Sequence, residues 1–223
     1  MIFLFMLAGG TVKRRQSQRK QLAREAAELL YSGQEKEHKQ AKLRAAKTLG
    51  LNCLPSNAEV EAEMDRIAEE REGKARQQRL KLMRCEALEA MHLLESFNPI
   101  LVGSVWRGTA RYSSDMDIFA YSDSHEAVLL TLEESNFGII RTEKHSLKKQ
   151  KAQSGSSFHI FLKSPSGNLV EVVVKSRVAE KLRQICSIYG DKITGLSIQQ
   201  LKSVLENNPH QRFVPIRTHM RKP

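Results

Sequence analysis

Helical periodicity runs through residues 1–95. Apolar residues recur there at the three- and four-residue spacing of one helix face, for example at Leu22, Ala26, Leu29 and Leu30. The pattern predicts a helix over residues 12–32, a second one that ends near residue 49, and a long one over residues 57–94. The apolar end of the long helix, residues 80–94, is expected to pack against a sheet formed by the second half of the chain.

Local signals refine these helices. Two serine–glutamate pairs have the spacing of capping boxes, namely Ser32 with Glu35 and Ser56 with Glu59. Gly50 follows the second helix at the position where a left-handed residue ends many helices. Gly73 lies inside the long helix and is predicted to kink or split it.

The second half of the chain alternates strands and helices. Strands are predicted over residues 100–103, 115–121, 138–142, 157–163 and 169–175. Helices are predicted over residues 123–135, 176–189 and 197–205, and a surface loop over residues 141–151. The fold class is therefore α/β (α+β), with a helical extension ahead of a small sheet domain.

Charge changes this picture by suggesting a partner. The 223 residues include 36 Lys and Arg against 25 Asp and Glu, a formal net charge of +11. Much of the excess lies in residues 13–47, which hold eleven Lys or Arg and four Glu. A basic surface of this kind favours nucleic acid, RNA more than DNA, as a partner. A solvated helical face is the equally matched alternative.

The cysteines and the apolar start bear on location. Cys53, Cys85 and Cys186 lie far apart without metal-ligand spacing, and an odd number argues against a disulfide framework. A reducing, cytoplasmic setting is expected. The opening MIFLFMLAGG is much shorter than the ~20 residues of a transmembrane helix, so no membrane partner is expected.

Two aspartates one residue apart are the candidate chemistry. In a strand over residues 115–121, Asp115 and Asp117 project from one face, whereas Met116 and Ile118 face the core. Like charges side by side on a rigid strand repel each other unless a divalent cation holds them. The spacing therefore predicts a metal site.

A phosphate-binding turn is predicted just before the aspartates. Gly103 lets the backbone approach a phosphate closely, and a helix starting after Ser104 would offer free N–H groups and the Ser104 hydroxyl. Arg107 and Arg111 lie between this turn and the aspartates, where they could neutralise phosphate charge. Trp106 could stack a base or serve the structure.

The run GSVWRGTARYSSDMDIF carries a family resemblance. It resembles the signature of the minimal nucleotidyltransferases of the polymerase-beta-like superfamily, in which Gly-Ser, Arg-Gly and Ser-Asp-x-Asp follow in this order. Arg107 matches the arginine of the Arg-Gly step, whereas Val105 stands where the family often has another arginine. The resemblance implies a small mixed-sheet domain that transfers a nucleoside monophosphate from an NTP to an acceptor hydroxyl and releases pyrophosphate.

Glu171 is the candidate third carboxylate. It is the one charged residue within the apolar run LVEVVV, and a carboxylate there either faces solvent or meets a cation. The resemblance implies a third carboxylate on such a strand, more often Asp than Glu. It makes Asp115, Asp117 and Glu171 the catalytic ligands of two Mg²⁺ ions, with Mn²⁺ as a substitute. His159 is interpreted as a partly exposed strand histidine rather than a catalytic one.

These observations divide the chain into an apolar segment (1–12), a basic helical region (13–95), a nucleotidyltransferase-like domain (96–207) and a basic tail (208–223). The leading hypothesis is a metal-dependent nucleotidyltransferase whose acceptor is RNA, a protein or a small molecule. The alternative is a catalytically inactive domain of this fold that binds nucleic acid.

Overall fold

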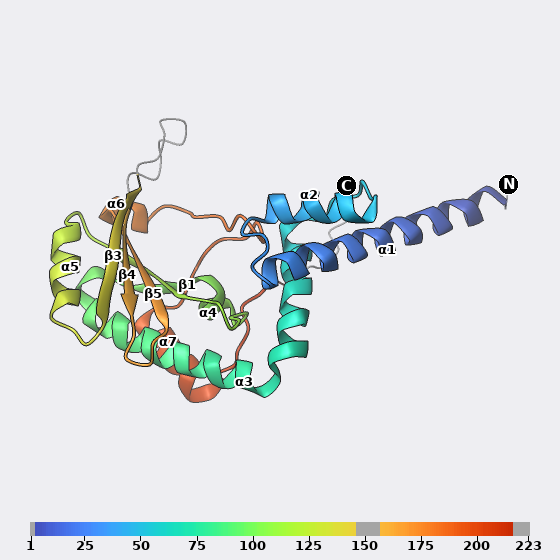
Figure 1. Cartoon of the computed structure of the whole chain (residues 1–223). Helices are drawn as coiled ribbons and strands as arrows, with labels where there is room; N and C mark the ends of the chain where they lie inside the picture. Colours follow the sequence, from blue (N-terminus) through green and yellow to red (C-terminus); the bar gives the residue numbers. More distant parts are fainter. Residues whose placement is uncertain (1–2, 146–156, 216–223) are drawn as a thin grey trace. The chain divides into compact units, whose positions relative to one another are not determined.

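The computed structural model describes residues 3–145 and 157–215 (Figure 1). The chain divides into two compact units, Met1–Gly73 with Cys186–Gly190, and Lys74–Ile185 with Asp191–Pro223. All three cysteines are free. Within the described part of the chain, no helix combines the length and the apolar character needed to cross a membrane.

The first unit is helical. It consists of α1 (Phe3–Tyr31), α2 (His38–Leu49) and the first half of α3 (Asn57–Leu93). Its core combines four alanines with five larger apolar side chains, and its members are Leu22, Ala26, Ala27, Leu29, Ala41, Ala45, Val60, Met64 and Ile67. The small alanine side chains allow α1 and α2 to approach closely.

One predicted capping box is confirmed and the other is wrong. At the start of α3, the Glu59 carboxylate accepts from the Ser56 backbone N–H at 2.7 Å, and the Glu59 N–H donates to Ser56 Oγ at 3.3 Å. Ser32 instead donates its hydroxyl to the Glu28 carbonyl oxygen at 2.7 Å. That bond satisfies the end of α1, and α2 begins only at His38.

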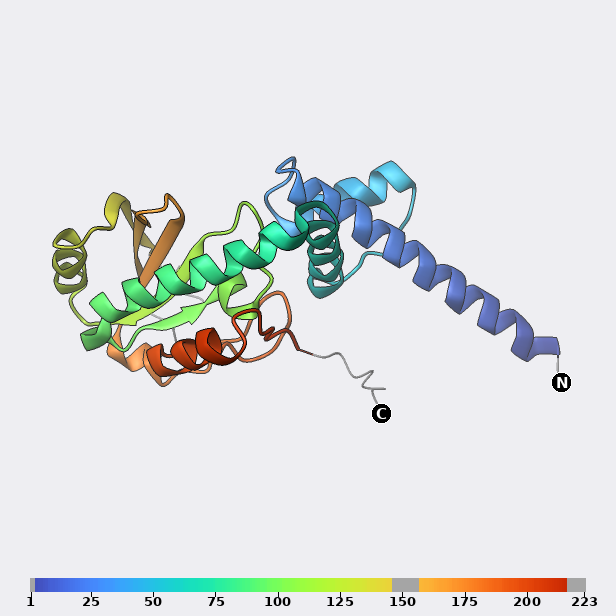
Figure 2. The same cartoon turned by 90° about the horizontal axis from the view of Figure 1, so that it is seen from below.

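Gly73 interrupts α3, as predicted. Its dihedral angles, φ 51° and ψ −133°, lie outside the helical region, and the division into units falls here rather than near residue 95. The reason is packing, because Leu80, Met83, Ala87, Met91 and Leu94 share a hydrophobic core with the sheet. Figure 2 shows this second half of α3 running along the sheet.

The second unit contains a five-stranded mixed sheet with the order β1-β2-β5-β4-β3. Its strands are β1 (Ile100–Val102), β2 (Met116–Tyr121), β3 (Gly138–His145), β4 (Ser157–Lys163) and β5 (Leu169–Lys175). Strands β2 and β5 are parallel, whereas the other neighbours are antiparallel. The expected mixed α/β architecture is confirmed.

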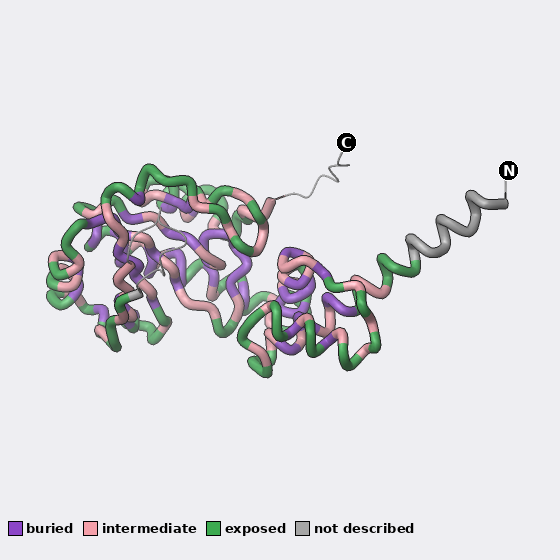
Figure 3. The backbone as a smooth tube through the Cα atoms, turned by 90° about the horizontal axis from the view of Figure 1, so that it is seen from above, coloured by how far each residue is buried: buried purple, intermediate pink, exposed green. Residues whose placement is uncertain are grey.

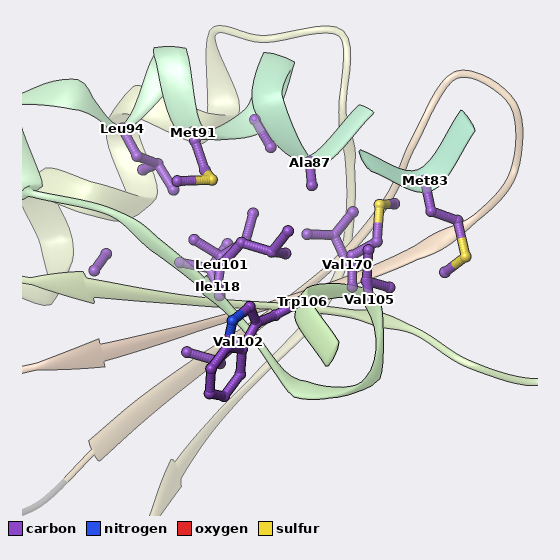
Figure 4. Close-up of a cluster of buried hydrophobic side chains, with 14 of the residues drawn as sticks. Met83, Ala87, Met91, Leu94, Leu101, Val102, Val105, Trp106, Ile118 and Val170 are labelled. Carbon is purple, nitrogen blue, oxygen red and sulfur yellow. The ribbon is translucent and has the colours of Figure 1, made fainter. Parts of the chain in front are cut away.

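The sheet has one closed face. Leu101, Met116, Ile118, Val172 and Ile160 are fully buried. Figure 4 shows α3 side chains, among them Met91 and Leu94, directed toward Leu101 and Ile118. Because strand side chains alternate, Asp117 and Glu171 lie on the opposite face. Figure 3 shows buried, intermediate and exposed positions along the backbone.

Short helices connect and flank the strands. They are η1 (Glu95–Phe97), α4 (Gly103–Arg107), α5 (His125–Glu133), α6 (Arg177–Glu180) and α7 (Ile198–Asn207). Ser124 caps α5 by accepting from the Ala127 N–H. At α7, Ser197 and Gln200 form a capping box.

Two predicted elements are wrong. The helix expected over residues 176–189 is reduced to α6, and Val178 and Ile185 from its predicted apolar face are 72% and 61% exposed. A short amphipathic stretch that buries no apolar face lacks the packing that stabilises most helices. The loop expected from residue 141 is a strand up to His145, paired with β4, and residues 146–151 of that loop lie outside the described residues.

Arg84 ties α4 to the C-terminal segment. Its fully buried guanidinium donates to the carbonyl oxygens of Val105 at 3.2 Å and Trp106 at 3.0 Å, both in α4. It also donates to the carbonyl oxygens of Pro209 at 2.7 Å and Gln211 at 2.8 Å. The described part of the predicted tail, residues 208–215, therefore packs beside α4.

Replacing Arg84 with Met should destabilise the second unit by about 3 kcal/mol or more, because several buried carbonyl groups would lose their donors. Chemical denaturation of the full chain measures this change. Lys81→Met on the exposed side of the same helix is the matched control and should change stability by less than about 0.5 kcal/mol. Equal stabilities of the two variants would contradict the structural role of Arg84.

Candidate metal centre

Three carboxylates meet on the open face of the sheet. Asp117 on β2 and Glu171 on β5 are direct partners in the parallel register, so their side chains project side by side. Asp115 precedes β2 by one residue and joins them. The three residues offer one oxygen each, and these oxygens lie within 4.8 Å of one another. The structure thus brings together all three predicted ligands.

Burial and mutual repulsion make this cluster costly as three free anions. The pKa of Asp117 is raised to about 8, first by burial and then by the charges of Asp115 and Glu171. Burial also raises the pKa of Asp115, and the charge of Glu171 adds to it. Protons or a cation can relieve this repulsion.

The donor set fits a hard divalent cation. Carboxylate oxygens from Asp115, Asp117 and Glu171 are the ligand type that Mg²⁺ and Mn²⁺ prefer. Among the described residues, these three form the group of Asp, Glu, His or Cys side chains whose ligand atoms lie close enough to one another to hold a metal ion.

Gly103 is required by the position of Asp117. It has φ +70°, and a Cβ atom at this position would lie 1.9 Å from Asp117 Oδ2. No other residue type could keep both the backbone and the carboxylate where they are. Gly103 is also the first residue of α4, with the half-buried Ser104 directly after it, so the predicted turn begins beside the carboxylates.

Arg107 is engaged inside the protein. Its buried guanidinium donates to Asp191 Oδ1 at 2.8 Å and to the Phe213 carbonyl oxygen at 2.9 Å. It also lies over the Trp106 ring, 4.4 Å from the centroid. These contacts, together with the burial of Trp106, give both residues a structural role at the end of α4. The predicted phosphate contact of Arg107 stays a prediction.

Arg111 lies in the turn between α4 and β2. Its backbone N–H donates to Ser114 Oγ at 2.9 Å, which shapes the turn just before Asp115. Arg76, from α3, donates to the carbonyl oxygens of Thr109 and Ala110 at the start of this turn. The role of the Arg111 side chain in phosphate binding stays a prediction.

His159 contacts the cluster, which the sequence does not predict. Its Nδ1 lies 2.6 Å from Glu171 Oε1, and its Nε2 lies 2.9 Å from Ser157 Oγ. The sequence contains only part of the information needed to predict this contact. The two-residue spacing puts Ser157 and His159 on one face of β4, but nothing local shows that Phe161 pairs with Glu171.

A cavity of about 630 Å³ opens beside β1 and β2. Phe119 and Tyr121 line it, and both lie on the same face of β2 as Asp117 because they follow it at steps of two residues. Lys181, Arg183 and Lys192 add positive charge to its wall, and Glu95 and Glu180 add negative charge. The cavity therefore lies on the same face of β2 as Asp117 and has an aromatic and charged lining.

Comparisons with known proteins leave the family open. No protein-family model matches the chain, and no curated protein matches it. A solved structure, described as "Crystal structure of JHP933 from Helicobacter pylori", is similar in part, with 18% sequence identity and a TM-score of 0.26. The similarity covers 50% of each chain, so this chain matches half of that protein's length. A likeness at this level carries no argument about function.

Gly103→Ala should displace Asp117 and abolish any rise in melting temperature caused by Mg²⁺. The substitution also places a side chain at positive φ, which costs roughly 1–2 kcal/mol. Gly167→Ala is the matched control, since Gly167 also has positive φ but its nearest neighbour is the flexible Lys163 side chain at 3.6 Å. Thermal melting with and without Mg²⁺ compares the two. An unchanged Mg²⁺ response in Gly103→Ala would contradict the assignment.

Asp117→Asn should stabilise the metal-free protein at pH 8. Folding raises the pKa of Asp117 from 3.8 to about 8, so the contribution of Asp117 to stability is greatest below pH 4 and falls as the pH rises toward 8. The amide carries no charge and avoids this loss, which is on the order of a few kcal/mol at about 1.4 kcal/mol per pKa unit. Melting curves from pH 4 to 9 should show the two proteins diverging with rising pH.

Proposed function

We propose that the protein is a metal-dependent nucleotidyltransferase. It transfers a nucleoside monophosphate from an NTP to an acceptor hydroxyl and releases pyrophosphate. The observation that carries the proposal is the cluster of Asp115, Asp117 and Glu171 on neighbouring strands, with the Gly103 backbone directly against Asp117. The order of these residues in the sequence also resembles the nucleotidyltransferase signature.

Different residues of the chain would bind the metal and the phosphates. Asp115, Asp117 and Glu171 would hold Mg²⁺, or Mn²⁺ in its place. The bound metal supplies charge neutralisation on the phosphates and activation of the attacking oxygen. Gly103 lets the backbone lie against Asp117 and approach a phosphate closely, and Ser104 follows it at the start of α4.

Substrate space is available on the same face. The cavity beside Phe119 has the volume of an ordinary small-molecule site and begins two residues from Asp117. We place the pyrophosphate by Gly103, on the other side of Asp117, so the nucleoside extends toward Phe119 and Tyr121. An in-line displacement places the attacking hydroxyl opposite the leaving group, which fits this direction.

RNA is the favoured macromolecular acceptor on charge, and a protein is the other candidate. Several basic side chains of the helical unit are already in ion pairs, such as Arg19 with Glu59 and Arg24 with Glu70. Others are exposed and remain for a polyanion, namely Arg14, Arg15, Lys20, Lys39 and Lys47. These residues are also what the alternative, an inactive domain that binds nucleic acid, would use.

Incubation with α-labelled NTPs, Mg²⁺ and total cellular RNA and protein tests the proposal. We expect label in a macromolecule, and a loss of about 100-fold or more in Asp115→Asn and Asp117→Asn, as is typical when a charge-stabilising group is removed. Glu134→Gln, an exposed residue on the same unit, is the control and should keep full activity.

The alternative makes a different prediction in the same assay. An inactive nucleic-acid-binding domain would leave every macromolecule unlabelled while binding RNA tightly and with strong salt dependence. That combination would reject the proposed enzyme.

A further inference from the structure

A line of hydrogen bonds leads from the carboxylate cluster to a serine hydroxyl. Glu171 Oε1 lies 2.6 Å from His159 Nδ1, and His159 Nε2 lies 2.9 Å from Ser157 Oγ. Both side chains of the first pair are about four-fifths buried, with exposed fractions of 19% for His159 and 20% for Glu171. Nucleotidyl transfer to a separate acceptor gives no role to Ser157 or His159.

The direction of these hydrogen bonds follows from the chemistry of the groups. When Glu171 is ionised as a metal ligand it only accepts, so His159 Nδ1 would then carry the hydrogen and donate to Glu171. In the neutral imidazole, Nε2 is then the acceptor, and the Ser157 hydroxyl donates to it. A carboxylate has two oxygens, so this bond leaves Glu171 able to take part in the cluster.

The strand geometry holds the arrangement in place. Ser157 and His159 are two residues apart on β4 and share a face with Phe161, which pairs with Glu171 across β4 and β5. The His159 and Phe161 rings stack with centroids 6.4 Å apart. The serine therefore lies on the open face of the sheet, on the β4 side of the carboxylates.

A hydroxyl that donates to an imidazole, which a carboxylate orients in turn, is the arrangement of an activated nucleophile. Here the orienting carboxylate is itself a member of the proposed metal centre, so the nucleophile and the transfer site share Glu171. We propose that Ser157 is an acceptor within the same chain and that the protein nucleotidylates itself there, with His159 as the base. This inference rests on the proposed function.

The step balances without a further reactant. Ser157 Oγ attacks the α-phosphorus of the NTP, and its proton passes to His159 Nε2. A bond forms between Oγ and phosphorus, while the bond from phosphorus to the β-phosphate oxygen breaks. Pyrophosphate leaves with the electron pair, and the chain retains a nucleoside monophosphate as a phosphodiester on Ser157.

Intact mass and peptide mapping of the full chain after incubation with Mg²⁺ and NTP test the inference. We expect a gain of one nucleoside monophosphate, located on Ser157. Ser157→Ala and His159→Gln should lose it. Ser203→Ala should keep it, since Ser203 is an exposed serine on α7 whose hydroxyl accepts from Asn207 Nδ2 at 3.2 Å. Melting curves establish that each variant is folded.

A second measurement needs no metal and no NTP. A fluorophosphonate probe reacts with activated serines, forming an oxygen–phosphorus bond and expelling fluoride. We expect Ser157 to react at least about tenfold faster than Ser203, consistent with general-base assistance, and His159→Gln to abolish the difference. This separates an activated hydroxyl from a merely structural hydrogen bond.

The outcomes distinguish self-nucleotidylation from the proposed function. Transfer to RNA or protein with Ser157 unmodified and no faster with the probe than Ser203 would overturn self-nucleotidylation and leave the proposed function standing. Absence of transfer to every acceptor, Ser157 included, would overturn both.

Discussion

The structure of the second unit depends on holding three mutually repelling carboxylates together. Asp117 and Glu171 lie on two adjacent strands, and Asp115 directly precedes one of them. Asp117 and Glu171 are fixed side by side by the parallel register, and burial raises the pKa of Asp117 to about 8. Such an arrangement persists only if the strands cannot move apart. The fully buried core on the other face, where α3 covers Leu101 and Ile118, supplies that rigidity.

The same constraint explains how α4 is held. At the first residue of α4, Asp117 leaves no space for a Cβ atom on Gly103. At its other end, Arg84 and Arg107 bind the carbonyl groups of α4 and of the C-terminal segment that packs against it. A helix of only five residues has little stability of its own, so these contacts keep its start at the carboxylates.

Much of the site was predictable because its signals are local. The two-residue spacing of Asp115 and Asp117, and a lone Glu171 in an apolar strand, depend only on strand periodicity and the cost of burying charge. The contact of His159 with Glu171 was missed, since it depends on the register of β4 and β5. Arg107 looked like a phosphate ligand in sequence, and its bonds to Asp191 and Phe213 connect residues more than eighty positions apart.

The errors in the predicted secondary structure also arise from contacts that the local sequence does not reveal. Residues 176–189 show helical periodicity, yet Val178 and Ile185 find no apolar surface to cover them. Ser32 and Glu35 have the spacing of a cap, but Ser32 bonds backward to Glu28 and closes α1 instead. In the first case tertiary packing decides the outcome, and in the second a hydrogen bond to the preceding turn does. Periodicity and spacing in the sequence report neither.

Anomalous diffraction from crystals grown with Mn²⁺ tests the central claim most directly, namely that the repelling carboxylates form a metal centre. We expect a manganese peak within bonding distance of carboxylate oxygens from Asp115, Asp117 and Glu171. Saturating Mn²⁺ with no peak at these three residues, in a protein that otherwise keeps this structure, would contradict it.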